Sequence, residues 1–388
     1  MNLRLLILTA GYGEGHNAAA RALATAWEAR NGRGQAVVVD VFALAAPRLN
    51  ELTRRAYLGL INHAPNLWRA AYGWLDRSAA VPQLLRGLQA ERKVLSAVIA
   101  REDPVAICCT YPVYAFLLRV LAEEEGMAVP FFNVVTDSIS INSLWWRAGA
   151  AGWFLPNEDS RPALLQAGVD PELIAVSGFP VPPFFADNEG RLTPPDLAAG
   201  AVPRVLYIIN SGTRGSAETA RRLLQETNWE VTCTVGRNAG LQTERSRLAA
   251  GRRAPATILG WTSEIPRLLM THHVVVSKAG GATTQEALAA GCPMIVNQIV
   301  PGQEEGNYEL LRRHGVGALA ETPDAVLAAL QRAFADEGRE WRRWRLALRR
   351  IAHPTAGPEV VSAILGAMAR PAGETDVPLA WPPAAATA

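Results

Sequence analysis

The sequence predicts an α/β protein with two Rossmann-like, doubly wound domains. Three observations support this fold class. The chain has 388 residues, which is more than one hydrophobic core usually organises. Short apolar runs alternate with longer helical patterns in both halves, as expected when parallel strands are buried on both faces. A proline-rich stretch, residues 180–195, separates the two halves.

The first half begins with an apolar strand at residues 5–8, which leads into a glycine turn and a strongly helix-forming sequence. Residues 48–101 have a helical pattern that Pro65 and Pro82 interrupt. We expect residues 1–185 to form the N-terminal domain, with further strands at residues 37–41, 105–109, 131–136 and 152–155.

The second half repeats this alternation after a linker at residues 186–203. We expect residues 204–338 to form the C-terminal domain, with strands at residues 205–209, 231–235, 256–259, 274–277 and 293–296. Residues 339–370 are helical and are expected to pack back towards the N-terminal domain. Their arginine and tryptophan cluster favours a packed or solvated face over contact with lipid headgroups. The Pro/Ala-rich residues 371–388 predict a disordered tail.

Composition excludes several classes of protein. Hydrophobic residues make up 49% and charged residues 19%, and the net charge is +2. These values are typical of a globular chain and argue against a general nucleic-acid binder. The four cysteines have no metal-ligand spacing, so no zinc site is expected, and a reducing cytoplasmic setting is favoured. The longest uncharged run, residues 105–118, is too short to cross a bilayer.

The segment at residues 277–306 has the pattern of an anion site. It follows the apolar run 274–276, passes through a glycine turn at Gly280 and Gly281, and opens a helix at Thr283. A helix N-terminus offers free N–H groups and a favourable dipole to a negative charge, and glycine lets the backbone approach a phosphate. The sequence therefore predicts a diphosphate site here.

A second candidate site lies at the end of the first strand, where a turn that contains Gly13 and Gly15 leads to His16. Ligands bind at the carboxyl ends of strands in such folds, and a histidine there can take a proton from an alcohol. A structural histidine beside a tight turn is an equally good interpretation of the spacing. Asp137 follows another strand and could act as a base, orient His16 or cap a turn.

Four other features are compatible with ligand contact, but each has an ordinary structural explanation. Ser211 and Gly212 lie in a glycine turn after a strand. Glu286 could accept hydrogen bonds from ribose hydroxyls or simply complement a helix dipole. The polar loop 301–307 suits a hexose but could be a solvated loop. Residues 52–75, with their aromatic side chains and arginines, could hold a lipid, lie on a membrane or pack in the core.

Taken together, these motifs resemble those of GT-B glycosyltransferases related to monogalactosyldiacylglycerol synthase and the processive diacylglycerol glucosyltransferases. The resemblance covers about residues 5–365 and is strongest in SKAGGATTQEALAAGCPMI and IVPGQEEGNYELLRRHGVG. It implies two domains facing across a cleft, with a UDP-sugar bound by the second. The donor residues would be Gly260, Trp261, Thr262, Lys278, Gly280, Gly281, Ala282, Thr283, Thr284, Glu286, Gln303, Glu304 and Asn307.

The resemblance also implies a mechanism and a location. His16 would be the base in a direct, inverting displacement that needs neither a metal nor a cofactor, and the sequence contains no Asp-x-Asp motif. The acceptor would be a lipid hydroxyl, most simply that of diacylglycerol, and the enzyme would lie peripherally on the cytoplasmic face of the cell membrane. Two departures from the family pattern, at Glu14 and Asn142, concern the acceptor side.

Several alternatives remain open from the sequence. A UDP-sugar epimerase with the same double fold would act on the donor with no acceptor present. A non-catalytic protein that binds a sugar nucleotide or a lipid is a third possibility. Glucose and galactose differ at one hydroxyl, so the motifs do not distinguish them, and they do not fix the number of sugars added or the oligomeric state.

Overall fold

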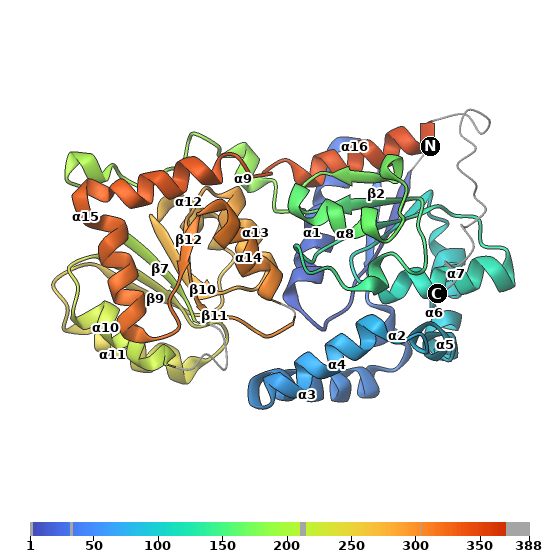
Figure 1. Cartoon of the computed structure of the whole chain (residues 1–388), viewed down its shortest axis with the longest axis horizontal. Helices are drawn as coiled ribbons and strands as arrows, with labels where there is room; N and C mark the ends of the chain where they lie inside the picture. Colours follow the sequence, from blue (N-terminus) through green and yellow to red (C-terminus); the bar gives the residue numbers. More distant parts are fainter. Residues whose placement is uncertain (1–2, 32–33, 210–214, 303, 370–388) are drawn as a thin grey trace. The chain divides into compact units, whose positions relative to one another are not determined.

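The computed structural model describes residues 3–31, 34–209, 215–302 and 304–369. Its contacts divide the chain into two compact units. Unit 1 contains the described residues of Met1–Pro183, Pro301–Gly306 and His353–Ala388, and unit 2 contains those of Phe184–Val300 and Asn307–Ala352. Each unit is built on a parallel sheet of six strands (Figure 1), which confirms the predicted α/β class. The expected tail at residues 371–388 lies outside the described residues.

The sheet of unit 1 has the strand order β2-β1-β3-β4-β5-β6. From β1 the chain moves outward to β2 and then returns to β3 on the other side of β1. The carboxyl ends of β1 and β3 therefore form a topological switch point, where doubly wound sheets bind ligands. The strands are β1 (Arg4–Leu8), β2 (Gln35–Val39), β3 (Ala106–Cys109), β4 (Phe131–Val134), β5 (Gly152–Leu155) and β6 (Ile174–Val176).

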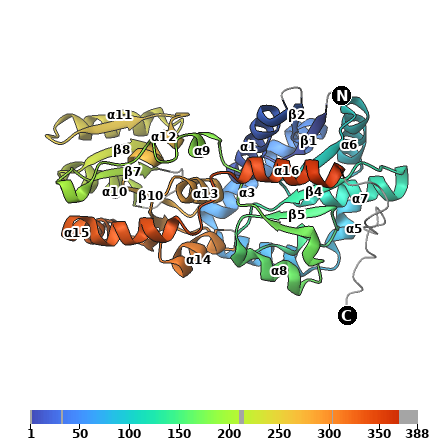
Figure 2. The ribbon, with the colours of Figure 1, turned by 90° about the horizontal axis from the view of Figure 1, so that it is seen from above.

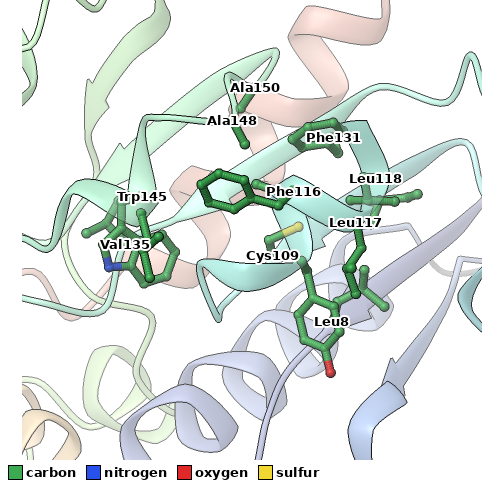
Figure 3. Packing of buried hydrophobic residues seen from close by; sticks show 14 of the residues in the cluster. Leu8, Cys109, Phe116, Leu117, Leu118, Phe131, Val135, Trp145, Ala148 and Ala150 are labelled. Atoms are coloured by element: carbon green, nitrogen blue, oxygen red, sulfur yellow. The ribbon is translucent and has the colours of Figure 1, made fainter. Parts of the chain in front are cut away.

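Helices cover both faces of this sheet. On one face, α1 (Glu14–Asn31) and α16 (Ala356–Ala369) lie side by side (Figure 2) and bury a cluster that includes Trp27 and Val360. On the other face, α6 (Gln89–Glu102) and α7 (Val113–Glu125) bury a larger cluster. Figure 3 shows part of it, with Phe116, Leu117 and Leu118 of α7 beside Leu8, Cys109 and Phe131 of the strands.

The helical segment between β2 and β3 is divided at its prolines. Pro65 is the first residue of its helix, a position where a proline loses no hydrogen bond. Asp40 caps the first helix of the segment, and its Oδ1 accepts a hydrogen bond from the Ala43 N–H at 2.9 Å. The helices are α2 (Val41–Ala45), α3 (Pro47–His63), α4 (Pro65–Arg77) and α5 (Val81–Arg86), and the short α8 (Arg161–Gln166) follows β5.

The sheet of unit 2 has the order β12-β11-β10-β7-β8-β9. Its switch point lies between β7 and β10, because the chain leaves β7 towards β8 and β9 and then returns to β10 on the opposite side. The strands are β7 (Arg204–Ile208), β8 (Glu230–Thr234), β9 (Ala256–Leu259), β10 (Val274–Lys278), β11 (Met294–Gln298) and β12 (Gly317–Leu319).

The long helix α15 (Pro323–Leu348) packs on one face of this sheet, together with α10. Non-helical backbone at residues 335–338 kinks α15. Beyond the kink, Trp341 and Trp344 are buried, and the Trp341 indole N–H donates to the His273 carbonyl at 2.7 Å. The tryptophans of the arginine and tryptophan cluster are therefore packed, in agreement with the expectation of a packed or solvated face. The other helices of unit 2 are α9 (Phe184–Asp187), α10 (Ser216–Gln225), α11 (Ala239–Ala250), α12 (Ile265–Thr271), α13 (Gly281–Ala289) and, from Asn307 on, α14 (Glu305–His314).

No helix in the described part of the chain is long and apolar enough to cross a membrane.

Candidate active site

His16 lies in the first turn of α1, at the switch point of the first sheet. Its Nδ1 is 2.7 Å from the carbonyl oxygen of Thr110, which directly follows β3, and 2.9 Å from the hydroxyl of Thr136, which follows β4. A carbonyl oxygen can only accept a hydrogen bond, so Nδ1 carries the proton and Nε2 has the free lone pair. The contact with Thr110 thus fixes the tautomer that can accept a proton from a substrate.

Burial controls the charge of His16. The side chain is 8% exposed, and burial lowers its pKa to about 4, although the hydrogen bond to the Thr110 carbonyl acts in the opposite direction. The ring is therefore neutral at pH 7. The residues that position it, Thr110 and Thr136, were not among the predicted site residues, although both follow strands.

The side chain of Asp40, which directly follows β2, holds the glycine turn before His16. The Gly11 N–H donates to Asp40 Oδ2 at 2.9 Å, so Asp40 joins the turn to the start of α2. Gly13 directly precedes α1, and Gly15 lies in its first turn beside His16. Glu14 is exposed and forms an ion pair with Arg21 on the same helix.

Asp137 accepts hydrogen bonds from its own loop. Its Oδ2 accepts from the indole N–H of Trp145 at 2.8 Å, and the backbone of Asn142 donates to the carboxylate as well. Burial is the largest effect and raises the pKa of Asp137 to about 6. The neighbouring Thr136, rather than Asp137, contacts His16, because its hydroxyl oxygen lies 2.9 Å from Nδ1.

Aromatic rings extend from His16 towards α3 and α4. The His16 ring packs edge-on against Tyr111, with centroids 5.1 Å apart, and Tyr111 stacks on Tyr12 at 5.9 Å. Tyr12 contacts Tyr57 at 6.0 Å, and Tyr57 contacts Trp68 at 4.9 Å. These rings form an aromatic wall that extends from His16 to the helices of residues 47–77.

The predicted anion site is at the switch point of the second sheet. β10 ends at Lys278, and Gly280 takes the N-cap position of α13 without any side-chain cap. The helix begins at Gly281, two residues earlier than expected, so Glu286 lies in the second turn. Ala282 and Thr283 are partly exposed in the first turn, whereas Thr284 is fully buried and its hydroxyl faces the Met294 sulfur at 3.8 Å.

Asn307 supports the turn before α13. Its Nδ2 donates to the Ala279 carbonyl at 2.9 Å, and its Oδ1 is buried without a hydrogen-bond partner in the described part of the chain. A buried acceptor of this kind is costly unless something bonds to it. Glu304 is buried, and Gln303 lies outside the described residues.

The segment of donor residues at 260–262 that the resemblance implies follows β9. Trp261 is 68% exposed, with the guanidinium of Arg237 6.0 Å from the centre of its ring. Gly260 lies close to Gln242, because a Cβ at this glycine would be 3.1 Å from Gln242 Oε1. The Thr262 hydroxyl accepts from the Glu264 N–H at 3.1 Å. Ser211 and Gly212 lie outside the described residues.

Comparisons with known proteins agree with the resemblance seen in the motifs. Residues 16–181 match the family model described as monogalactosyldiacylglycerol (MGDG) synthase. The chain is 25% identical over 341 residues to a processive diacylglycerol beta-glucosyltransferase from Bacillus pumilus, which covers 87% of this chain and 88% of the relative. It is 26% identical over 398 residues to the chloroplastic protein named "Probable monogalactosyldiacylglycerol synthase 2" from Oryza sativa subsp. japonica, covering 96% and 82%.

A solved structure supports the fold. The glycosyltransferase SnogD from Streptomyces nogalater superposes with a TM-score of 0.55 at 16% identity, covering 94% of this chain and 99% of that one. The predicted resemblance is confirmed: the chain is similar over most of its length to MGDG synthases and processive diacylglycerol glucosyltransferases, and it has the two-domain α/β fold of GT-B glycosyltransferases.

Proposed function

We propose that the protein is a glycosyltransferase that moves a hexose from a UDP-sugar to the hydroxyl of diacylglycerol. The observation that carries this proposal is His16, a buried and neutral imidazole whose tautomer leaves Nε2 able to accept a proton. The names of the relatives support a hexosyltransferase acting on diacylglycerol.

In this mechanism His16 Nε2 takes the proton of the acceptor hydroxyl as its oxygen attacks C1 of the hexose. The bond from C1 to the diphosphate breaks, and UDP leaves with the electron pair. A single displacement inverts the configuration at C1. Burial keeps the ring in its neutral, accepting form at pH 7, and the Thr110 carbonyl stabilises the ring as it becomes protonated.

The donor half of the reaction belongs to unit 2. The uncapped N–H groups at the start of α13 would bind the diphosphate, and the absence of a Cβ at Gly280 and Gly281 would allow its close approach. Glu286 would bind the ribose and the exposed Trp261 would stack on the uracil. The helix N-terminus and Lys278 would stabilise the departing UDP, so the proposed mechanism uses no metal ion.

We propose a peripheral membrane location through the surface of α2–α5, where α3 and α4 lie side by side (Figure 1). Residues 47–77 contain five arginines against two acidic residues, which favours anionic lipid. Half of the exposed large hydrophobic residues of the described chain belong to these four helices: Leu44, Leu49, Leu52, Leu67, Trp74 and Leu84. The aromatic wall would then lead from the bilayer to His16.

Sedimentation with vesicles tests this location. Wild-type protein should sediment with vesicles that contain anionic lipid, and a variant combining Leu52→Ser, Leu67→Ser and Trp74→Ser should bind at least tenfold more weakly. Leu165→Ser and Leu346→Ser remove other exposed leucines and serve as controls. Equal binding by the triple variant and the controls would contradict the proposed surface.

A donor screen tests the function. The protein should transfer hexose from UDP-glucose or UDP-galactose to diacylglycerol in vesicles, and mass spectrometry of the lipid should show the added hexose. Incubation with the donor alone should leave the sugar nucleotide unchanged. Epimerised donor in that incubation would instead support an epimerase, and binding of donor without any turnover would support a non-catalytic protein.

A further inference from the structure

Ile139 has a backbone conformation that branched residues rarely adopt. Its φ is 58°, in the left-handed region. In the described part of the chain the other residues with positive φ are glycines, Asp103, Asp336 and Glu337. A branched Cβ clashes with the backbone in this region, whereas glycine has no Cβ. The surrounding structure must therefore hold Ile139 in place.

Ile139 is the central residue of a tight turn that begins just after Asp137. The Ser140 N–H donates to the Ser138 carbonyl across the turn at 2.6 Å, and the Ile141 N–H donates to the Ile139 carbonyl at 3.1 Å. Three-residue turns with a positive φ at the centre are rare and strained. Since Asp137 precedes the turn, the shape of the turn helps to set the direction of its carboxyl group.

A buried polar network holds this turn from the segment after β5. The Ile139 N–H donates to the hydroxyl of Ser160 at 3.0 Å, and that hydroxyl donates to Asn157 Oδ1 at 2.8 Å. Asn157 Nδ2 in turn donates to the hydroxyl of Ser138 at 3.2 Å. Ser138, Asn157 and Ser160 are each no more than 5% exposed, so these hydrogen bonds are costly to break.

We propose that Asn157 and Ser160 are positioning residues of the active site, which hold Ile139 in its strained turn. Held in this way, the turn keeps Asp137 against Trp145 and the Thr136 hydroxyl against His16. Strained backbone persists where surrounding contacts over-determine it, and it concentrates at functional sites. The identity of the reaction rests on the proposed function, but the geometry of the turn does not.

The test compares substitutions that remove the hydrogen bonds of the turn with one at a positive φ elsewhere. Ser160→Ala removes the acceptor of the Ile139 N–H, and Asn157→Ala removes the side chain that bonds Ser138 and Ser160. Both should lower kcat for hexose transfer at least fivefold while KM for the UDP-sugar stays within twofold. Ile139→Val keeps the branched Cβ and should retain kcat within twofold. Asp103→Gly relieves a positive φ at the exposed end of α6 and should leave kcat unchanged.

A second readout needs no substrate. Hydrogen exchange of the Trp145 indole N–H, with its NMR signal assigned through Trp145→Phe, reports the contact with Asp137. Exchange should be slow in wild-type protein and in Asp103→Gly, and at least tenfold faster in Asn157→Ala and Ser160→Ala. Wild-type kcat and slow exchange in both of the latter variants would overturn the inference. If the wild type transfers no hexose, the proposed function fails, and indole exchange alone decides the role of the turn.

Discussion

At the residue scale, the proposed chemistry depends on which nitrogen of His16 carries the proton. The contact between Nδ1 and the Thr110 carbonyl settles this, because only a protonated Nδ1 can donate to it. The sequence predicted His16 as a candidate from its place after an apolar strand. It could not predict the tautomer, because Thr110 and Thr136 are 94 and 120 residues away along the chain.

The lowered pKa of His16 gives a prediction for the pH dependence of catalysis. Burial stabilises the neutral ring, so the form that accepts a proton should persist well below the usual pKa of 6.5. We expect kcat/KM for the UDP-sugar to change less than twofold as the pH falls from 7 to 5.5. Circular dichroism at each pH provides the control for folding. Half-loss of kcat/KM near pH 6.5 would contradict a buried, neutral base.

At the element scale, short strands and their ends were the least predictable features. The apolar runs predicted ten of the twelve strands. They missed β6 and β12, which have three residues each, because so short a run carries no pattern. The run predicted at residues 37–41 ends as a strand at Val39, because the Asp40 side chain caps a helix there. The early start of α13 likewise follows from Gly280 at its N-cap.

The junction of α12 and β10 gives a prediction for stability. His272 is buried, and burial lowers its pKa to about 4. Between pH 6.5 and 4 the unfolded chain therefore binds more protons at this residue than the folded chain does, so acid destabilises the fold. His272→Gln should reduce the loss of unfolding free energy between pH 7 and pH 5 by about 2 kcal/mol, measured by urea denaturation. The same pH dependence in the variant and the wild type would show that His272 does not contribute.

The docking of α16 in unit 1 gives a second prediction for stability. Gly178 follows β6 with a φ of 88°, and a Cβ there would be 2.2 Å from the Cβ of His353, just before α16. Gly178→Ala should lower the free energy of unfolding by about 3 kcal/mol, because it adds a clash to backbone strain. Gly168→Ala, at a φ of 80° in open space, adds only the strain and should cost about 1 kcal/mol. Equal effects of the two substitutions would contradict the close packing of α16.

At the scale of the whole molecule, the two sheets share a parallel arrangement of six strands but differ in strand order. Each has a switch point, with His16 at the first and the start of α13 at the second. The sequence predicted both positions because each follows an apolar strand and a glycine turn. The sequence did not predict contacts between distant segments, such as the aromatic contacts of Tyr111 and the network of Asn157 and Ser160.

The most direct test of the proposed mechanism is the rate at which the variant His16→Ala transfers hexose from UDP-hexose to diacylglycerol. The affinity of the variant for UDP is measured by calorimetry. Arg21→Gln is the matched control, since it removes an exposed side chain from the same helix. We predict that His16→Ala lowers kcat by at least 100-fold and leaves the Kd for UDP within twofold, while Arg21→Gln retains wild-type kcat. A kcat for His16→Ala within twofold of the wild type would contradict the assignment of His16 as the base.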